Sequence, residues 1–281
     1  MKKYNVGILG ATGAVGREML KILEEYEFPI GNLRLLASKR SVGKKISFQG
    51  NDILVEEATA SSFKGLDFVL GAASNPVAIQ FKNSIIEAGA IFIDNSSAFR
   101  LDEDVPLVVP EINGEDVFLH KGIIANPNCS TIIALMAMTG IAKLSKIEAV
   151  NASTYQATSG AGVEGPRELR RQMEAKLNGD ALETKVFPYP IVENLIPQIG
   201  DFLENAYTKE EMKMQNEGRK IMHLPELKVD CTCVRVPVVR SHSIALTIKT
   251  EDILSIEDIK REISNTKGCK LVDDPTTLSY P

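Results

Sequence analysis

Hydrophobic residues in the first half of the chain form short runs, and the segments between these runs carry apolar residues at helical spacing. The predicted buried strands span 4–9, 33–37, 67–72, 90–94 and 123–125. A helix is predicted after the first strand, residues 28–32 read as a loop, and Asn75-Pro76 opens a second helix that ends near Gly89. Strands that alternate with helices indicate βαβ units and a parallel sheet.

The pattern changes after residue 128. The predicted strands span 147–156, 232–239 and 243–250. The predicted helices span 164–177, 208–222 and a short segment from 255, and the proline-rich stretch 178–207 is irregular. We therefore expect an α/β protein with two domains. Residues 1–128 would form a Rossmann-like parallel-sheet domain, and residues 129–281 an α+β domain in which a mostly antiparallel sheet carries helices on one face.

Composition and charge argue against several classes of function, among them nucleic-acid binding and membrane association. The 281 residues carry a net charge of −5, which argues against nucleic acid or an anionic membrane as a default partner. No apolar run approaches the roughly 18 residues that cross a bilayer. The glycine-rich start does not suit a signal peptide, so we expect a cytoplasmic protein. The four cysteines are sparse, and Cys231-x-Cys233 lacks a second pair with zinc-like spacing, so we expect neither a disulfide framework nor a metal site.

A glycine-rich turn follows the first predicted strand and opens a helix. Gly10, Gly13 and Gly16 would let the backbone approach a pyrophosphate, whose charge a helix N-terminus stabilises. The spacing differs from the usual G-x-G-x-x-G, so the position within a βαβ unit carries the argument. The alternative interpretation is a glycine turn without a ligand.

The end of the second predicted strand bears on the choice of cofactor. An NAD enzyme usually carries an acidic residue there, which binds the ribose 2′-OH. This chain instead has Ser38, Arg40 and Ser41, whose hydroxyls and positive charge suit a 2′-phosphate. The pattern indicates NADP, and the competing interpretation is a solvated basic loop.

Cys129 stands between a turn and a long apolar helix. Pro127 favours an extended chain before the turn, and Asn128 and Ser130 suit a helix N-terminus. Unpaired backbone N–H groups and the positive end of the helix dipole would favour the thiolate, which is the nucleophilic form of cysteine. The alternative is a small buried thiol that packs under a helix.

Several ordered motifs are similar to those of one enzyme family. They are Gly10-Ala-Thr-Gly-Ala-Val-Gly16, Asn95-Ser-Ser-Ala-Phe-Arg100, the Cys129 turn, Tyr155-Gln-Ala-Thr-Ser-Gly-Ala-Gly162, Asn216-Glu-Gly-Arg-Lys220 and Arg235-Val-Pro-Val-Val-Arg240-Ser-His242-Ser243. Together they resemble aspartate-β-semialdehyde dehydrogenase over the whole chain. The resemblance implies NADP-dependent reduction of β-aspartyl phosphate to aspartate semialdehyde, on the route to lysine, threonine and methionine. It also implies a homodimer formed by the second domain.

The resemblance implies roles for three catalytic residues. Cys129 would attack the acyl phosphate and form a thioester, which hydride from NADPH then reduces. His242 would act as the acid/base, although a histidine on a strand is by itself more often structural. Gln156 would position the acyl group beside the thiol.

Binding residues are implied in the same way. Arg235 would clamp the substrate carboxylate, although strand alternation alone places Arg240, and not Arg235, on the face of His242. Glu217 would pair with the substrate ammonium, and its alternative is a surface ion pair with Lys220. The implied substrate-binding set is Arg235, Glu217, Lys220, Arg100, Asn95 and Asn128, with Lys220 and Arg100 on the phosphate. The implied cofactor-binding set is Gly10, Thr12, Gly13, Ala14, Val15, Gly16, Ser38, Arg40, Ser41, Ser159 and Gly160.

Two other functions fit parts of the sequence. N-acetyl-γ-glutamyl-phosphate reductase performs the same chemistry, but it typically has glycine at the position of Asn128, and its substrate has no free ammonium for Glu217. The second alternative is a homologue that binds nucleotide without catalysis. The resemblance implies a further C-terminal segment after Pro281 that helps hold the nicotinamide, which favours this alternative. The presence of Cys129, Gln156 and His242 together favours an enzyme.

Overall fold

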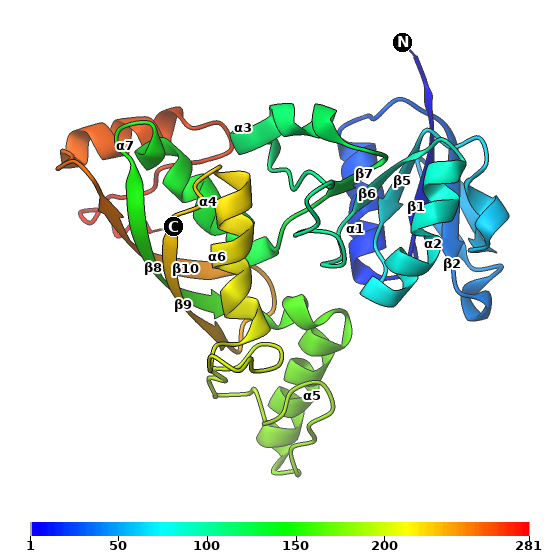
Figure 1. Cartoon of the computed structure of the whole chain (residues 1–281). Helices are drawn as coiled ribbons and strands as arrows, with labels where there is room; N and C mark the ends of the chain where they lie inside the picture. The colour runs from blue at the N-terminus through cyan, green and yellow to red at the C-terminus, as the bar shows by residue number, and fades with distance from the viewer. Residues whose placement is uncertain (1, 281) are drawn as a thin grey trace. The chain divides into compact units, whose positions relative to one another are not determined.

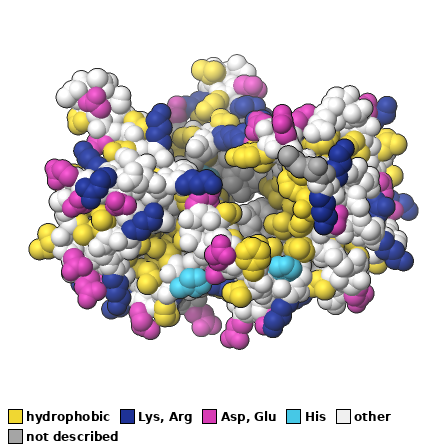
Figure 2. All heavy atoms as spheres, turned by 90° about the horizontal axis from the view of Figure 1, so that it is seen from above, with side chains coloured by type: hydrophobic (Ala, Val, Ile, Leu, Met, Phe, Trp, Pro, Cys, Tyr) yellow, Lys and Arg dark blue, Asp and Glu magenta, His cyan; other side chains and the backbone are white. Residues whose placement is uncertain are grey.

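The computed structural model describes residues 2–280, which divide into two compact units. Within this range, the first unit comprises residues 2–108 and 115–127, and the second comprises residues 109–114 and 128–280. Within the described range, no helix combines the length and hydropathy that crossing a bilayer requires. Acidic and basic side chains are interspersed on the face that Figure 2 shows, as expected for a small net charge.

The first unit is built on a seven-stranded sheet in the order β3-β4-β2-β1-β5-β6-β7 (Figure 1). Its strands are β1 (Tyr4–Leu9), β2 (Ile30–Ala37), β3 (Lys45–Phe48), β4 (Asn51–Glu57), β5 (Phe68–Gly71), β6 (Ile91–Asp94) and β7 (Ile123–Ala125). All neighbouring pairs are parallel except β3 and β4, which pair antiparallel. The expected Rossmann-like sheet is confirmed.

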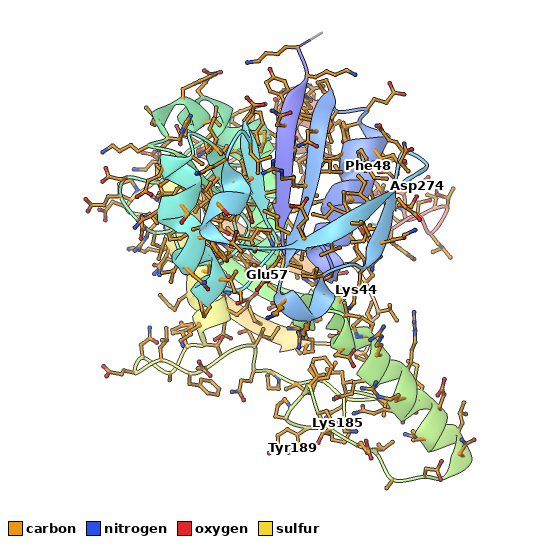
Figure 3. All side chains as sticks on the ribbon, turned by 90° about the vertical axis from the view of Figure 1, so that its right-hand side faces the viewer. Lys44, Phe48, Glu57, Lys185, Tyr189 and Asp274 are labelled. Atoms are coloured by element: carbon orange, nitrogen blue, oxygen red, sulfur yellow. The ribbon has the colours of Figure 1, made fainter. Side chains whose placement is uncertain are left out.

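Two helices cover this sheet, α1 (Ala14–Glu25) and α2 (Asn75–Glu87). The apolar face of α1 buries Leu20 against Ile8 and Leu35 of the central strands. The same cluster includes Phe48 of β3, which Figure 3 labels beside the sheet. Burial of one such side chain stabilises the fold by about 1.5–3 kcal/mol, so this cluster fixes the turn between β1 and α1 in place.

Two features of the first unit differ from the sequence prediction. Strand β2 begins at Ile30, inside the expected loop, because Tyr4 of β1 pairs with Ile30 across the sheet. The β3–β4 hairpin was not predicted at all. Its alternation is largely polar, and only Ile46, Phe48 and Val55 are buried, so its pairing depends on the neighbouring β2.

The second unit contains a three-stranded sheet in the order β10-β8-β9. Strand β8 (Ile147–Gln156) pairs antiparallel with β10 (Ser243–Thr250) and parallel with β9 (Lys228–Arg235). The sheet is therefore mixed, and the expectation of a mostly antiparallel sheet is wrong. Strand β9 also ends at Arg235, before Pro237, because proline cannot donate to a strand ladder.

The described part of this unit contains five α-helices: α3 (Pro110–Asn113), α4 (Cys129–Ala142), α5 (Glu164–Asn178), α6 (Lys209–Ile221) and α7 (Ile256–Asn265). Helix α4 is apolar on nearly all sides and contacts β8, β10, α6 and α7. The predicted capping box at Thr208 and Glu211 is present at the start of α6. Helix α4 is thus held on several sides, which fixes the position of its first residue.

The irregular stretch after α5 is organised by one buried carboxylate. Glu168 of α5 accepts N–H groups from Lys185, Val186 and Phe187. The labelled Lys185 and Tyr189 in Figure 3 lie on this stretch, next to α5. A buried acceptor that receives several N–H groups replaces the hydrogen bonds that a strand or helix would supply. The predicted irregular segment is therefore confirmed, and it has an ordered internal network.

Candidate active site

The start of α4 is closed by the side chain of Asn128. Its Oδ1 accepts the N–H groups of Ser130, at 3.0 Å, and Thr131, at 3.3 Å. This is the bonding pattern of an N-cap residue, which satisfies donors that the helix itself leaves unpaired. Cys129 is the first residue of the capped helix, so its backbone has little freedom.

A histidine contacts the thiol. Nε2 of His242 lies 3.3 Å from Sγ of Cys129. Ser241 immediately before it has a φ of +78°, a left-handed conformation that is uncommon outside glycine and turns the chain just before β10. Nδ1 of His242 accepts the N–H of Ala157 at 3.0 Å. The neutral imidazole therefore carries its proton on Nε2, the nitrogen that faces the sulfur.

The electrostatic surroundings of the thiol differ from the sequence expectation. One side of Cys129 is open to solvent. Burial of its other sides raises the pKa of the thiol, and the charge of Glu210 raises it further. The backbone N–H groups of Ser130 and Cys129 lower the pKa, as a helix start should, but they are outweighed. The net shift is upward, so the expectation that the helix start favours the thiolate is wrong for this state of the site.

The histidine is shifted toward its neutral form. Burial lowers the pKa of His242, and the charge of Arg235 lowers it further, against a smaller opposing effect of Glu210. At neutral pH the site therefore contains a thiol and an Nε2–H imidazole in hydrogen-bond contact. Such a ring can donate a proton or a hydrogen bond at Nε2 without first being charged.

Arg235 is buried at the end of β9, where it pairs in register with Gln156 of β8. A terminal guanidinium nitrogen of Arg235 donates to the carbonyl oxygen of Ala157 at 2.7 Å. A Cβ on Gly160 would lie 2.8 Å from that guanidinium, so a side chain there would displace it, whereas the 3.6 Å to the His242 ring is an ordinary contact. Strand alternation had placed Arg240, and not Arg235, on the same face as His242. That argument does not apply, because β9 ends at Arg235 and Arg240 lies outside a strand.

Helix α6 brings two buried carboxylates to Asn128. Oε2 of Glu217 accepts the backbone N–H of Asn128 at 2.7 Å. Oε1 of Glu210 accepts from Nδ2 of Asn128 at 3.0 Å and from Nε2 of Gln156 at 3.1 Å. Lys220 lies on the same helix, three residues after Glu217. Glu210 was not predicted, although it and Glu217 are seven residues apart and so lie on one helix face.

The first unit contains the predicted nucleotide turn, which lines a cavity of about 440 Å³. Gly10, Thr12, Gly13 and Ser38 line it, whereas Ala14, Val15 and Gly16 form the start of α1. Gly10 has a φ of +91°, and a Cβ there would meet the carbonyl oxygen of Ala72 at 2.5 Å, so only glycine fits. Arg40 and Ser41 belong to a short 3-10 helix (Lys39–Ser41) next to this cavity wall but are not among its lining residues.

Two charged residues of the cavity were not predicted. Lys39 lines it beside Ser38, and Glu57 lines it from the end of β4. Glu57 reaches this place because β2 and β4 pair in parallel, with Ala37 opposite Glu57. Figure 3 shows Glu57 where β4 ends. The sequence argument considered only acids that follow β2, so it overlooked one on the neighbouring strand.

The remaining predicted site residues are divided between the units. Asn95 and Arg100 lie in the loop after β6 of the first unit, where Arg100 donates to the carbonyl oxygens of Asn95 and Ser96, each at 3.0 Å. Ser159 and Gly160 lie in the 3-10 helix Thr158–Ala161 of the second unit. Within the second unit the structure brings together Cys129, His242, Gln156, Arg235, Asn128 and Glu217.

A nucleotide-binding parallel sheet joined to a unit with a cysteine–histidine pair defines an NAD(P)-dependent oxidoreductase of the semialdehyde dehydrogenase class. Residues 5–120 match the model of the semialdehyde dehydrogenase NAD-binding domain, and residues 138–281 match the model of the semialdehyde dehydrogenase dimerisation domain. Aspartate-semialdehyde dehydrogenase of Bacillus subtilis is 47% identical, over 99% of this chain and 82% of its own length. The chain belongs to the aspartate-semialdehyde dehydrogenase family.

Solved structures agree with this assignment. Aspartate semialdehyde dehydrogenase II of Vibrio cholerae, complexed with ASA, has a TM-score of 0.94 and 43% identity over 95% of this chain and 80% of that chain. The enzyme of Candida albicans, solved with NADP, has a TM-score of 0.72 and 27% identity over 93% of this chain and 76% of that chain. The predicted family and fold class are therefore confirmed.

Proposed function

We propose that this chain reduces β-aspartyl phosphate to aspartate semialdehyde through a thioester on Cys129, with NADP as the cofactor. Family membership supports the reaction. The observation that carries the mechanism is the 3.3 Å contact between Sγ of Cys129 and Nε2 of His242 at the capped start of α4. A nucleophile in hydrogen-bond contact with an oriented imidazole is an arrangement suited to acyl transfer.

The cysteine would form and release the acyl group. Sγ of Cys129 attacks the acyl carbon, the bond from that carbon to the phosphate oxygen breaks, and inorganic phosphate leaves. The sulfur must lose its proton for this attack. One side of Cys129 is open to solvent, which takes up the proton, and the charge of Arg235 favours the anionic sulfur. Once the acyl carbon has taken up a hydride, the bond between that carbon and the sulfur breaks, the aldehyde is released and the sulfur departs with the bonding electrons. The Nε2–H of His242 is placed to donate to the departing sulfur.

The cofactor would bind in the first unit. The cavity wall that Gly10 forms has no room for a Cβ, and no side chain caps α1 in the described structure, so its N-terminal amides suit a pyrophosphate. When bound, the nicotinamide would supply the hydride. Ser38, Arg40 and Ser41 support NADP, as does the NADP-bound relative, and Lys39 adds a further cation on the cavity wall. Among the described residues that line the cavity, the unpredicted Glu57 is the one that carries a carboxylate.

Substrate charges would be matched by the remaining residues. Arg235 would bind the α-carboxylate and Glu217 the α-ammonium, since both are buried and lie around the thiol network. Lys220 and Arg100, with Asn95, would hold the phosphate, and Asn128 shapes this site through the helix cap. We also propose that the protein works as a cytoplasmic homodimer, in keeping with the match of residues 138–281 to a dimerisation domain.

The test is phosphate-dependent oxidation of aspartate semialdehyde, followed by the absorbance of NADPH. We expect turnover that requires phosphate and prefers NADP to NAD. N-acetyl-γ-glutamyl semialdehyde is the competing substrate, and preferential turnover of it would overturn the substrate assignment. The same assay on a form extended by a relative's C-terminal segment separates a weak cofactor site from a non-catalytic nucleotide-binding protein. Absence of turnover in both forms would contradict the proposal.

A further inference from the structure

Glu210 binds the side-chain amides of Asn128 and Gln156, which lie next to Cys129 and His242. One of its oxygens, Oε1, accepts from both Asn128 and Gln156, and the other, Oε2, accepts from Nζ of Lys213 at 2.8 Å. Glu210 is only 9% exposed. Burying a carboxylate is costly, and hydrogen bonds to both of its oxygens offset that cost.

The network determines which way each amide faces. Burial alone would raise the pKa of Glu210, but Lys213 and the hydrogen bonds from Lys213, Asn128 and Gln156 together hold it below the ordinary value. Glu210 is therefore ionised at neutral pH and can only accept hydrogen bonds. The amide nitrogens of Asn128 and Gln156 must face it, and their oxygens must face away.

The opposite end of each amide is fixed as well. Oδ1 of Asn128 caps α4, and Oε1 of Gln156 accepts the hydroxyl of Thr154 at 3.0 Å. Asn128, Gln156 and Thr154 are all buried. The amides of Asn128 and Gln156 therefore cannot rotate without leaving a buried polar group unpaired. Gln156 has two N–H groups, and Glu210 takes one of them.

We propose that Glu210 is a positioning residue, which fixes the amide of Gln156 so that its second N–H, and not its oxygen, faces the acyl oxygen of the substrate. This rests on the proposed function, in which Gln156 positions the acyl group. A preorganised N–H at a developing oxyanion is worth about 10²–10³-fold in kcat, because it stabilises the negative charge that forms during attack. A rotated amide would present a second negative dipole to that charge instead.

The test is a double-mutant cycle on turnover of aspartate semialdehyde. Gln156→Ala should lower kcat by roughly 10²-fold. Glu210→Leu, which removes the acceptor, should lower kcat by roughly 10-fold or more with a smaller change in KM. The double variant should fall no further than about 3-fold below Gln156→Ala, because both changes remove the same interaction. Independent, multiplying losses would overturn the proposal.

Two measurements separate positioning from loss of structure. Glu211→Gln is the matched control, since Glu211 is equally buried on α6 but contacts Thr208 and Cys233 and neither amide. It should lower the melting temperature without the loss in kcat. Alkylation of Cys129 by iodoacetamide should proceed in Glu210→Leu at least as fast as in the parent, since a nearby negative charge has been removed. If alkylation of Glu210→Leu slowed in parallel with kcat, the loss of activity would come from a less reactive thiol or a disturbed fold, and the positioning role would be contradicted.

A second pair of variants tests the other end of the amide and does not depend on Glu210→Leu folding. Thr154→Val removes the donor to Gln156 at nearly constant volume, whereas Thr154→Ser keeps it. We expect Thr154→Val to lower kcat by roughly 3–10-fold and Thr154→Ser to keep most of the parent value. Equal activity of the two would overturn the proposal. A parent chain without turnover would instead be a failure of the proposed function, which the parent assay shows before any variant is compared.

Discussion

Helices α1 and α4 both begin after a strand and a turn, and their first turns are completed in different ways. Helix α1 starts after Gly13, and no side chain caps it within residues 2–280. Helix α4 starts after Asn128, whose side chain accepts two N–H groups and whose own N–H and amide bind Glu217 and Glu210. The first helix start is open, and the second is closed by the protein itself.

The difference follows from the kind of chemistry each helix start serves. A ligand that binds and leaves must supply the missing acceptors, so an uncapped end next to a glycine turn favours an anion. A nucleophile that belongs to the chain must instead stay in one place through a reaction cycle, and a capped helix restrains it. Under the proposed function, the same helix-end physics gives a nucleotide-binding site in one unit and a fixed covalent site in the other.

The largest effect is expected when the proposed nucleophile is removed. Cys129→Ser should lower turnover by on the order of 10⁴-fold or more, because a hydroxyl is far less acidic than a thiol and would rarely be ionised. Binding of NADP, measured by fluorescence titration, should be close to that of the parent, since the predicted cofactor cavity belongs to the first unit. Turnover within about tenfold of the parent would remove Cys129 from the mechanism.

Replacing the histidine should have the next largest effect. His242→Asn keeps a polar side chain but cannot exchange protons near neutral pH, and general acid–base catalysis is worth about 10²–10⁴-fold. Turnover should fall by that amount, while the melting temperature stays near the parent value.

The parent should also lose stability as the pH falls below about 6.5, because the pKa of His242 is lowered in the folded state and the unfolded chain binds the proton more readily.

A His242→Asn variant should lack that part of the pH dependence, which urea unfolding at several pH values measures. A variant with parental turnover, or one that simply unfolds, would return His242 to a structural role. A catalytic and a structural role of His242 can be distinguished only by the turnover of a folded variant. The folding of His242→Asn is therefore checked first by circular dichroism.

Cofactor choice tests the open helix start. Arg40→Ala should weaken NADP binding by roughly 1–3 kcal/mol, the range for a charge-assisted hydrogen bond, and leave NAD binding nearly unchanged. Lys39→Ala is the matched control, since Lys39 lines the cavity and Arg40 does not. A loss confined to Lys39→Ala would move the 2′-phosphate contact to Lys39. Equal weakening of both cofactors by Arg40→Ala would make Arg40 structural.

Local signals in the sequence predicted much of this structure, whereas features that depend on distant partners were missed. The capping box at Thr208 and the helix start at Asn75 were found because their determinants lie within a few residues. The β3–β4 hairpin was missed because its side chains are mostly polar and its stability comes from pairing with β2. The mixed sheet was missed because alternation predicts a strand but not the direction of its partner.

The site shows the same division. The family motifs led to Cys129 and His242, which the structure brings into contact. Their pKa shifts were not foreseen, because burial and the charges of Glu210 and Arg235 outweigh the local helix-end effect. Glu210 itself went unnoticed because a glutamate on a helix surface is common, and its meaning depends on amides far away in sequence.

The smallest predicted effect compares the two helix starts directly. Asn128→Ala removes an acceptor of two helix N–H groups and a partner of Glu210, so it should lower the free energy of unfolding by about 1–2 kcal/mol. Gly13→Ala removes no cap, and the added Cβ would touch only the carbonyl oxygen of Gly10 at 3.4 Å, so stability should change by less than about 0.5 kcal/mol. NADP binding should nevertheless weaken in Gly13→Ala, because the methyl group enters the cavity that Gly13 lines. Urea unfolding and NADP titration of both variants measure these effects. If Gly13→Ala lost as much stability as Asn128→Ala, the start of α1 would depend on Gly13 as strongly as the start of α4 depends on its cap, and the proposed difference between the two helix starts would be wrong.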